Sequence, residues 1–521
     1  MNRLARALAL AAVLAGSLTA CPERRESLQP PAKKPPQAAL APAPQGGPDV
    51  LTVPRPEGPE FFGLYLLGKK AGWTRLDFLR ELRRGQAVFV VRSETALSAT
   101  VGGKTVERRV VEERVYEARP AGPLLEFSGE WSGDGGERKV SGTCAAAICQ
   151  VTETSAGGTQ KRTLEGVAET ADQADAVRLA AARKASTRGR QLDLEKLRVK
   201  DVETSYLRRD RIAGAGVETP VAVVAEAEVG DRMAVEYRIA DDGRLLEMRL
   251  GEALVARPEP EAAAKKLDRI DLFALARVQV PSPLPRDVPA AITYRLAGLP
   301  KAFQVPDARQ RFEAAPNGEV LLTVSARVPA AADPAKDTPL ARARLGADPD
   351  DLAPGPQADS DAPAVKALAK DVVGDAKTAY AAALRLSDHV FRTLEKAYGA
   401  SHDRASDVLR AGRGDCTEHS VLLVALARAA GIPARGVHGL VYARYDDKVD
   451  ALYWHAWVEV RSAGEWIALD PTFGQPVADA THVALGRATQ VDAVGLLGAL
   501  QVKSVEINPP GLRPASKEKK P

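Results

Sequence analysis

The chain is poor in histidine and cysteine, and it carries almost no excess charge of either sign. Its 521 residues include six histidines and four cysteines, and 72 Lys and Arg stand against 68 Asp and Glu, for a formal net charge of +4. This balance argues against a dedicated nucleic-acid-binding protein, which would show a concentrated basic face. We interpret Lys517, Lys519 and Lys520 as a solvated tail and not as a binding patch.

After the N-terminal segment, the sequence has no apolar run long enough to span a bilayer. The N-terminus itself has a basic start at Arg3 and Arg6, followed by an apolar run over residues 7–18 with the length of a signal-peptide core. The run ends in LTAC, residues 18–21, which resembles the lipobox of bacterial lipoproteins. That resemblance implies cleavage before Cys21 and lipid attachment to it. The alternative is an ordinary secretory signal followed by an incidental cysteine.

Residues 21–59 are dense in Pro, Ala and Gln, a composition that cannot bury a core and that favours extended conformers. We therefore predict a disordered tether that holds the folded part away from a membrane. Pro22 is not the Asp that retains lipoproteins at the inner membrane in some bacteria. The expected location is the bacterial cell envelope, lipid-anchored, with the periplasmic side of the outer membrane favoured.

The few cysteines leave no paired ligand clusters of the kind that structural zinc uses. Cys144 and Cys149 have no histidine near them in sequence, and in an oxidising compartment they are candidates for a disulfide across a hairpin tip. Cys416, His419 and His438 lie closer together but offer only one thiol. We expect no metal and no organic cofactor.

Period-two alternation predicts a β-rich region over residues 60–330, as in QAVFVVRSETAL and VAVVAEAEVG. Residues 241–243, Asp-Asp-Gly, predict a hairpin turn, and ADQADAVRLAAARKAS predicts a short helix. Strand-like segments at residues 291–330 are either a smaller β unit that leads into the next domain or the last strands of this region.

A Pro- and Asp-rich connector is predicted over residues 331–362, where we place the main domain boundary. Apolar residues at helical spacing follow, so the fold class is α+β. A chain of this length is expected to hold two or three domains. The predicted parts are a signal peptide at 1–20, the tether at 21–59, the β-rich region at 60–330, the connector at 331–362, a C-terminal domain at 363–505 and a disordered tail at 506–521.

Three residues in this C-terminal domain suit nucleophilic catalysis. Cys416 opens an apolar stretch that predicts a buried helix, with Asp415 as its N-cap. His455 lies in YWHAWVEV, which alternates like a strand, and Asp470 ends the short run EWIALD. A thiol at a helix start, with a base and an orienting carboxylate on strands, is the arrangement of a thiol triad. The helix N-terminus is expected to stabilise a thiolate.

The segment GRGDCTEHSVLLVALARAAGIPARGVHGLVY, then YWHAWVEV, then EWIALDPTFGQPVADATH, resembles the transglutaminase-like (papain-like) core of bacterial proteins. The resemblance covers roughly residues 360–505 and rests on three separated motifs in the right order. It implies a papain-like core with helices packed on an antiparallel sheet. It also implies that Cys416 is the nucleophile, His455 the general base and acid, and Asp470 the residue that orients His455.

Three further residues are candidates for the walls of the cleft, each with an alternative. Trp457 shares a strand face with His455 and either lines the groove or packs in the core. Tyr442 either contributes to the cleft or packs in the core. His419 lies one helical turn after Cys416 and either faces the cleft or makes local hydrogen bonds in the first turn.

Two functions of different classes follow. The leading hypothesis is a cell-envelope thiol acyltransferase or hydrolase that acts on peptide or glutamine amide bonds through a thioester. The alternative is a non-catalytic envelope scaffold whose β-rich part binds a partner. The expected partners are a peptide or protein substrate in the envelope and the membrane, through the lipid anchor, with no nucleic acid.

Overall fold

The computed structural model describes residues 48–101, 104–133, 136–155, 158–214, 217–231, 234–284, 290–355, 357–397, 404–444, 449–486 and 496–508. The predicted signal peptide, Cys21 and most of the predicted tether lie outside these residues. Contacts divide the described chain into two compact units. The first holds residues 48–99 and 106–270, and the second holds the chain from Asp271 onward together with Thr100–Thr105.

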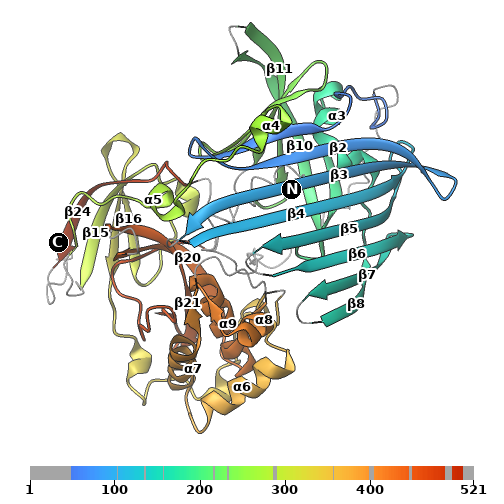
Figure 1. Cartoon of the computed structure of the whole chain (residues 1–521). Helices are drawn as coiled ribbons and strands as arrows, with labels where there is room; N and C mark the ends of the chain where they lie inside the picture. Colours follow the sequence, from blue (N-terminus) through green and yellow to red (C-terminus); the bar gives the residue numbers. More distant parts are fainter. Residues whose placement is uncertain are drawn as a thin grey trace, which may run out of the picture. The chain divides into compact units, whose positions relative to one another are not determined.

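The first unit is built on one 14-stranded sheet, drawn from blue to green in Figure 1. Its strand order is β8-β7-β6-β5-β4-β3-β2-β1-β14-β13-β12-β11-β10-β9, so nearly every strand pairs with its neighbour in sequence. Alternating burial along β3 and β4 matches the period-two pattern of their sequences. The strands are β1 Glu60–Leu66, β2 Lys69–Arg83, β3 Gln86–Val101, β4 Lys104–Glu117, β5 Leu124–Gly133, β6 Arg138–Ala145, β7 Ile148–Ser155, β8 Gly158–Glu165, β9 Thr187–Asp193, β10 Arg198–Gly214, β11 Val217–Glu228, β12 Val235–Ala240, β13 Leu245–Leu250 and β14 Leu254–Pro258.

Short helices and paired charges complete this unit. The predicted helix is two short helices, α2 (Ala171–Ala174) and α3 (Ala176–Arg183), and α4 (Glu261–Ala264) follows β14. The buried Arg114 guanidinium donates to the Glu169 carboxylate at 2.8 Å, and the Tyr116 hydroxyl donates to the same carboxylate at 2.6 Å. These buried charges are therefore paired and hydrogen-bonded, as buried charge requires.

Two local predictions match the geometry of this unit. The loop that joins β12 to β13 runs through residues 241–244, and Gly243 has a φ of +82°. A Cβ at Gly243 would lie 1.9 Å from the carbonyl oxygen of Pro54, so glycine is required there. At the tip of the β6–β7 hairpin, a disulfide joins Cys144 to Cys149.

The second unit contains two four-stranded antiparallel sheets. One has the order β22-β21-β20-β23 and the other the order β16-β17-β15-β24. The last strand of the chain therefore pairs with a strand some two hundred residues earlier. The bounds are β15 Ala291–Ala297, β16 Gln310–Ala314, β17 Val320–Ser325, β20 Ala434–Arg444, β21 Asp450–Ser462, β22 Glu465–Leu469, β23 His482–Gly486 and β24 Gln501–Asn508, with a parallel pair β18 Glu395–Lys396 and β19 Arg413–Gly414.

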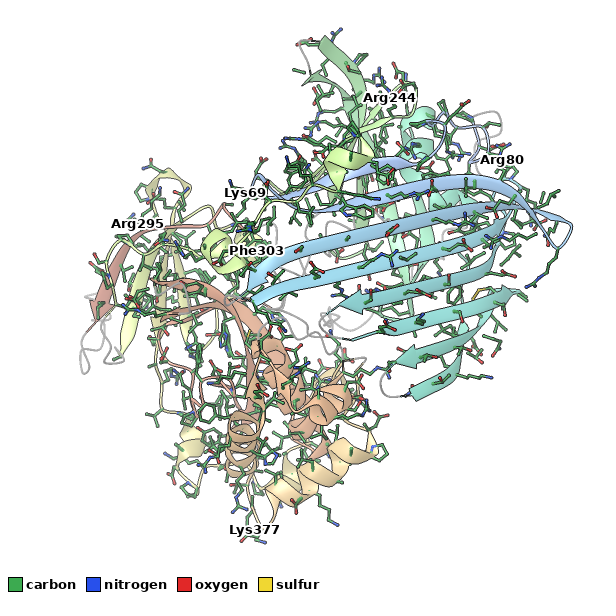
Figure 2. The ribbon with its side chains drawn as sticks, in the orientation of Figure 1. Lys69, Arg80, Arg244, Arg295, Phe303 and Lys377 are labelled. Carbon is green, nitrogen blue, oxygen red and sulfur yellow. A yellow bond between two sulfur atoms is a disulfide. The ribbon has the colours of Figure 1, made fainter. Side chains whose placement is uncertain are left out.

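Four helices pack together beside β20 and β21, as the orange part of Figure 1 shows. The central one, α9 (Cys416–Ala429), is buried at nearly every position, and its leucines form one core with Val458 and Val460 of β21. A helix that is apolar all round must be covered on all sides. Lys377, between α6 and α7, is an exposed residue at the edge of this layer (Figure 2). The other helices are α5 Leu272–Ala276, α6 Pro363–Val373, α7 Ala379–Thr393 and α8 Ala405–Ala411, with 3-10 turns η1 Lys301–Phe303, η2 Pro316–Gly318, η3 Ala330–Ala332, η4 Leu340–Arg342 and η5 Pro349–Asp351.

The structure places the division between units near residue 270 and not in the predicted connector, residues 331–362. Asp337, within that segment, is buried, and its carboxylate accepts from the backbone N–H groups of Tyr380 and Ala381 and from the Ser462 hydroxyl. A Pro- and Asp-rich sequence favours irregular backbone, but irregular backbone can still pack and cap a helix. The predicted connector is therefore a packed part of the second unit.

The ends of the folded part also differ from prediction. Val50 and Val53 are buried, so residues 48–59 belong to the first unit and not to the tether. Strand β24 continues to Asn508, so the predicted tail from 506 begins inside a strand. The strands at 291–325 belong to the second unit, so they are part of a smaller β unit and not the last strands of the β-rich region. Among the described residues, no helix is long and apolar enough to cross a membrane.

Candidate active site

Cys416 is the first residue of α9, and its neighbours hold that helix start in place. The Asp415 carboxylate accepts from the backbone N–H of Thr417 at 2.9 Å, and the Glu418 carboxylate accepts from the backbone N–H of Asp415 at 2.9 Å. The Asp415 carboxylate also accepts from the backbone N–H of Glu418, so Asp415 and Glu418 form a reciprocal capping box, and Asp415 is the N-cap that the sequence predicts. Cys416 is a free thiol and is 5% exposed.

The thiol differs from the expected thiolate. Burial, and after it the charge of Asp415, raise the pKa of the Cys416 thiol well above its ordinary value. The backbone N–H of Ala456 hydrogen-bonds to the sulfur and acts in the opposite direction on this pKa. Desolvation of the anion outweighs the partial positive charge of a helix start. The resting thiol therefore keeps its proton, and a base must remove it during a reaction.

His455 lies on β21, directly before Ala456, in a fixed orientation. Its Nε2 donates to Asp470 Oδ2 at 2.7 Å. Its ring stacks on Phe473, with centroids 4.8 Å apart and planes within 13°, and Trp457 lies at 6.2 Å on a similar plane. When the ring is neutral, the proton on Nε2 leaves a lone pair on Nδ1, which has no hydrogen-bond partner among the described residues.

Asp470 follows β22 and is fully buried. Its Oδ1 accepts from the backbone N–H groups of Thr472 and Phe473 at 2.7 and 3.0 Å, so the Asp-Pro-Thr turn holds the carboxylate. Burial acts to raise the pKa of Asp470, but the charges and hydrogen bonds of His455 and His482 outweigh it and hold that pKa below its usual range. Asp470 is therefore ionised and faces His455.

His482 has no predicted role, although it is the last residue of the segment EWIALDPTFGQPVADATH. His482 begins β23, and its Nε2 lies 3.0 Å from Asp470 Oδ2, while its Nδ1 lies 3.0 Å from Asp479 Oδ1. Burial acts to lower the pKa of His482, but the hydrogen bonds to both carboxylates outweigh it and raise that pKa. The signal available in the sequence was the spacing of Asp479 and His482, three residues apart after the Asp-Pro-Thr turn.

His455, Asp470 and His482 are also a group of side chains whose ligand atoms lie within 4.8 Å of one another. Both imidazole Nε2 atoms already approach the same carboxylate oxygen at hydrogen-bonding distance. These hydrogen bonds account for the clustering. That the site uses no metal stays a prediction.

The three predicted cleft residues have different surroundings. Trp457 is fully buried in a core cluster with Val437, so it packs as core and supports the His455 ring. The Tyr442 hydroxyl accepts from the backbone N–H of Leu284 at 3.0 Å, which anchors a neighbouring segment. His419 Nδ1 donates to the carbonyl oxygen of Asp415 at 2.7 Å, the local bond that was the alternative to a cleft role. Burial lowers the pKa of His419, so this ring is neutral.

The family model of the transglutaminase-like superfamily matches residues 366–471. The chain contains a transglutaminase-like domain. The match covers helices α6 to α9 and the strands up to Asp470, and it stops before His482. No curated protein matches the chain.

Solved structures overlap with parts of the chain at low identity. A candidate cysteine protease from Cytophaga hutchinsonii shares 18% identity over 44% of this chain and 82% of its own, with a TM-score of 0.27. A β-barrel-like protein of a domain of unknown function from Brucella abortus shares 12% over 41% of this chain and 96% of its own, with a TM-score of 0.28. The periplasmic domain of TgpA from Pseudomonas aeruginosa shares 14% over 36% of this chain and 88% of its own, with a TM-score of 0.21. TM-scores this low do not establish a shared fold.

Proposed function

We propose that the transglutaminase-like domain is a papain-like thiol acyltransferase or hydrolase that acts on peptide or glutamine amide bonds through Cys416, His455 and Asp470. One observation carries the proposal. The sulfur of Cys416 accepts a hydrogen bond from the backbone N–H of Ala456, the residue after His455. The thiol therefore lies against the strand that carries the imidazole. The His455 ring has Nε2 bound to Asp470, and its Nδ1 has no hydrogen-bond partner among the described residues.

The reaction follows from these positions. As the sulfur of Cys416 attacks an amide carbonyl, His455 Nδ1 takes the thiol proton, and the carbonyl oxygen becomes an oxyanion. The backbone N–H of Cys416, at the first position of α9, is one donor for that oxyanion. The intermediate collapses to a thioester, and the imidazolium gives its proton to the departing amine. The Asp470 carboxylate stabilises the imidazolium meanwhile.

The acceptor of the acyl group decides the product. Water, deprotonated by His455, attacks the thioester and gives a cleaved peptide bond or a deamidated glutamine, and the thiol regains the proton. A primary amine in place of water gives a cross-link. We favour peptide or amide hydrolysis over cross-linking, on a peptide or protein substrate in the cell envelope, with the chain anchored to the outer membrane through lipid on Cys21.

A peptide library and a primary-amine probe, incubated with the purified protein and followed by mass spectrometry, test the proposal. New peptide termini would identify a peptidase, conversion of glutamine to glutamate a deamidase, and amine incorporation a transferase. The Cys416→Ala protein is the control. It is expected to lose turnover by a factor of at least about 10³ and to keep its fold, because the substitution removes a single sulfur atom from the side chain. Equal turnover by the Cys416→Ala protein would reject the proposal. No turnover by either protein would favour the envelope scaffold.

A further inference from the structure

We propose that His482 is a permanently protonated positioning residue, whose imidazolium lies between Asp470 and Asp479 and keeps Asp470 ionised toward His455. The charge state of His482 is inferred from its hydrogen-bond geometry and does not depend on the proposed function, whereas its effect on Cys416 rests on that function. The residue makes no contact with the reacting sulfur in this scheme, because both of its ring nitrogens are engaged elsewhere.

The two hydrogen bonds of His482 require a hydrogen on each ring nitrogen. His482 Nε2 and Nδ1 each lie 3.0 Å from a carboxylate oxygen. An ionised carboxylate can only accept, so each nitrogen must carry a hydrogen. A neutral imidazole carries one hydrogen and would turn a lone pair toward the second carboxylate. The ring is therefore an imidazolium unless one of the two carboxylates is protonated.

Both carboxylates act as acceptors toward other donors. Asp479 Oδ1 also accepts from the backbone N–H of Thr481 at 2.9 Å and from its hydroxyl at 2.5 Å, and Oδ2 accepts from the Gln475 side-chain amide at 2.9 Å. Asp470 accepts at both oxygens as well. Burial acts to raise the pKa of Asp479, but the bonds from His482 and Thr481 outweigh it and hold that pKa below its usual range. A proton on Asp479 Oδ1 would leave one lone pair for the two Thr481 donors, and the charges and hydrogen bonds of His455 and His482 hold the pKa of Asp470 below its usual range.

The groups around the ring are compatible with this charge. His455 on β21 lies with its ring centroid 5.9 Å from that of His482 and has its own bond to Asp470. Trp457 meets the ring edge-on at 5.3 Å. The Arg309 guanidinium donates to the carbonyl oxygen of Asp479 at 2.6 Å. Other nearby titratable groups among the described residues are Cys416 and His419 on α9, which interact with Asp470, and Tyr294 on β15, which interacts with Asp479.

The neighbouring sheet holds this segment still. Gln310, at the start of β16, donates its amide to the carbonyl of Ala484 at 2.9 Å and accepts from the Ala484 N–H at 2.6 Å. Together with Arg309 on Asp479, these bonds pin the chain on both sides of His482. His482 is fully buried, so it cannot turn to solvent without breaking them. These hydrogen bonds and the burial of the ring fix the orientation of His482.

The His482 imidazolium keeps a positive charge beside Asp470 at every stage of the proposed cycle. His455 alternates between imidazolium and neutral imidazole during the proposed cycle. Beside a neutral His455, Asp470 would be a buried carboxylate without a positive neighbour, which is costly. The His482 imidazolium supplies that neighbour throughout, so Asp470 stays ionised and oriented in both halves of the cycle.

The charge state can be measured directly on the full-length protein. Six histidines make histidine-selective ¹⁵N labelling practicable. We expect the His482 signals, assigned by their loss in His482→Gln, to show both ring nitrogens protonated from about pH 5 to pH 9. In Asp479→Asn, which keeps shape and removes a charge, the same ring is expected to lose a proton within that range. A wild-type His482 that is a neutral tautomer at neutral pH would overturn the inference. Should His482→Gln fail to fold, the signal that moves in Asp479→Asn identifies the ring.

The positioning role is tested by the pH profile of Cys416 alkylation with iodoacetamide. His482→Gln keeps a donor toward Asp470 but removes a positive charge, and loss of a nearby positive charge makes deprotonation harder. The profile is therefore expected to move to higher pH by about one unit. His389→Gln, on the outer helix α7, is the matched control and should leave the profile unchanged.

The outcomes separate the two proposals. An unshifted profile in a folded His482→Gln protein would show that His482 only packs, even if its ring is charged. A profile that is the same in wild type and in His455→Ala would reject the Cys416–His455 pair, and hence the proposed function. The ¹⁵N measurement would still decide the charge of His482 in that case.

Discussion

The carboxylate of Asp470 accepts hydrogen bonds at both oxygens, and the two sets of donors have different origins. Its Oδ1 is held by backbone N–H groups two and three residues later in the chain, which is a local turn. Its Oδ2 is held by His455 and His482, which come from two other strands. The local bonds set where the carboxylate lies, and the distant ones set its charge.

Asp470→Asn is expected to reduce turnover by a factor on the order of 10³ to 10⁴ while the fold is kept. The amide nitrogen of Asn would donate toward His455 Nε2, so the neutral ring would carry its hydrogen on Nδ1 and could not accept the thiol proton. Turnover of the substrate found in the library assay measures this effect. Asp359→Asn, at a carboxylate that binds Ser406 outside the site, is the control. Unchanged turnover in Asp470→Asn would remove Asp470 from the mechanism.

At the residue scale, the sequence could single out Cys416, His455 and Asp470 because each has a local signature. Cys416 follows an N-cap residue, His455 lies in an alternating strand, and Asp470 precedes a proline. For His482 the only local signal is Asp479 three residues earlier, and its role depends on Asp470, which the fold brings to the other ring nitrogen. The protonated resting thiol was also beyond the sequence, because desolvation depends on how deeply the sulfur is buried.

At the scale of elements, the segment predicted to be a connector caps one of the helices. The Asp337 carboxylate accepts from two N–H groups in the first turn of α7 and from the hydroxyl of Ser462, the last residue of β21. Helix α7 has Thr378 at its N-cap, and the Thr378 side chain makes no capping bond. The orphan donors of its first turn are thus satisfied by a residue some forty positions earlier.

Asp337→Ala is expected to lower the free energy of unfolding of the second unit by about 1–3 kcal/mol, because two backbone donors and one hydroxyl lose a buried partner. Denaturant unfolding followed by circular dichroism measures this. Asp333→Ala, four residues earlier and exposed, removes a local bond to Ala335 and a surface ion pair with Lys336, and should cost much less. Equal effects of the two substitutions would contradict the capping role.

Helix α9 and strand β23 show which elements a sequence reveals. The helix is a continuous apolar run that begins at an N-cap and ends near Gly431, so the run and the residues that start and stop it suffice to predict it. Strand β23 has five residues, too few for a periodic signal, and its partners are β20 and the side chain of Gln310. Its place in the sheet comes from those partners.

At the scale of the molecule, the second unit is closed by pairing across long stretches of sequence. Strand β24 pairs with β15, and Arg309 and Gln310 reach the segment that carries His482. The transglutaminase-like domain at residues 366–471 therefore lies within a larger unit that starts near Asp271. The sheet of β15–β17 and β24 supports the site without contributing to the predicted triad.

A fragment of residues 271–508 is expected to unfold cooperatively, whereas residues 363–505, the domain predicted from the sequence, are expected to be poorly folded. The shorter fragment lacks Asp337 on α7, the partner of β24, and Gln310 on β23. Thermal unfolding by circular dichroism and the dispersion of amide NMR signals would compare them. A shorter fragment with the same melting temperature would show that these contacts add little.

The sequence by itself determined the α+β class, the alternation of the large sheet, the central helix and the three residues of the predicted triad. Each of these depends on neighbours within a few residues, where caps, periodicity and turn chemistry act. Only the tertiary structure decided the boundary between units, the capping role of Asp337, the neutral thiol and the place of His482 between two carboxylates. Those features depend on which distant groups share a buried volume, because burial and charge pairing are set by position in space and not by order in the chain.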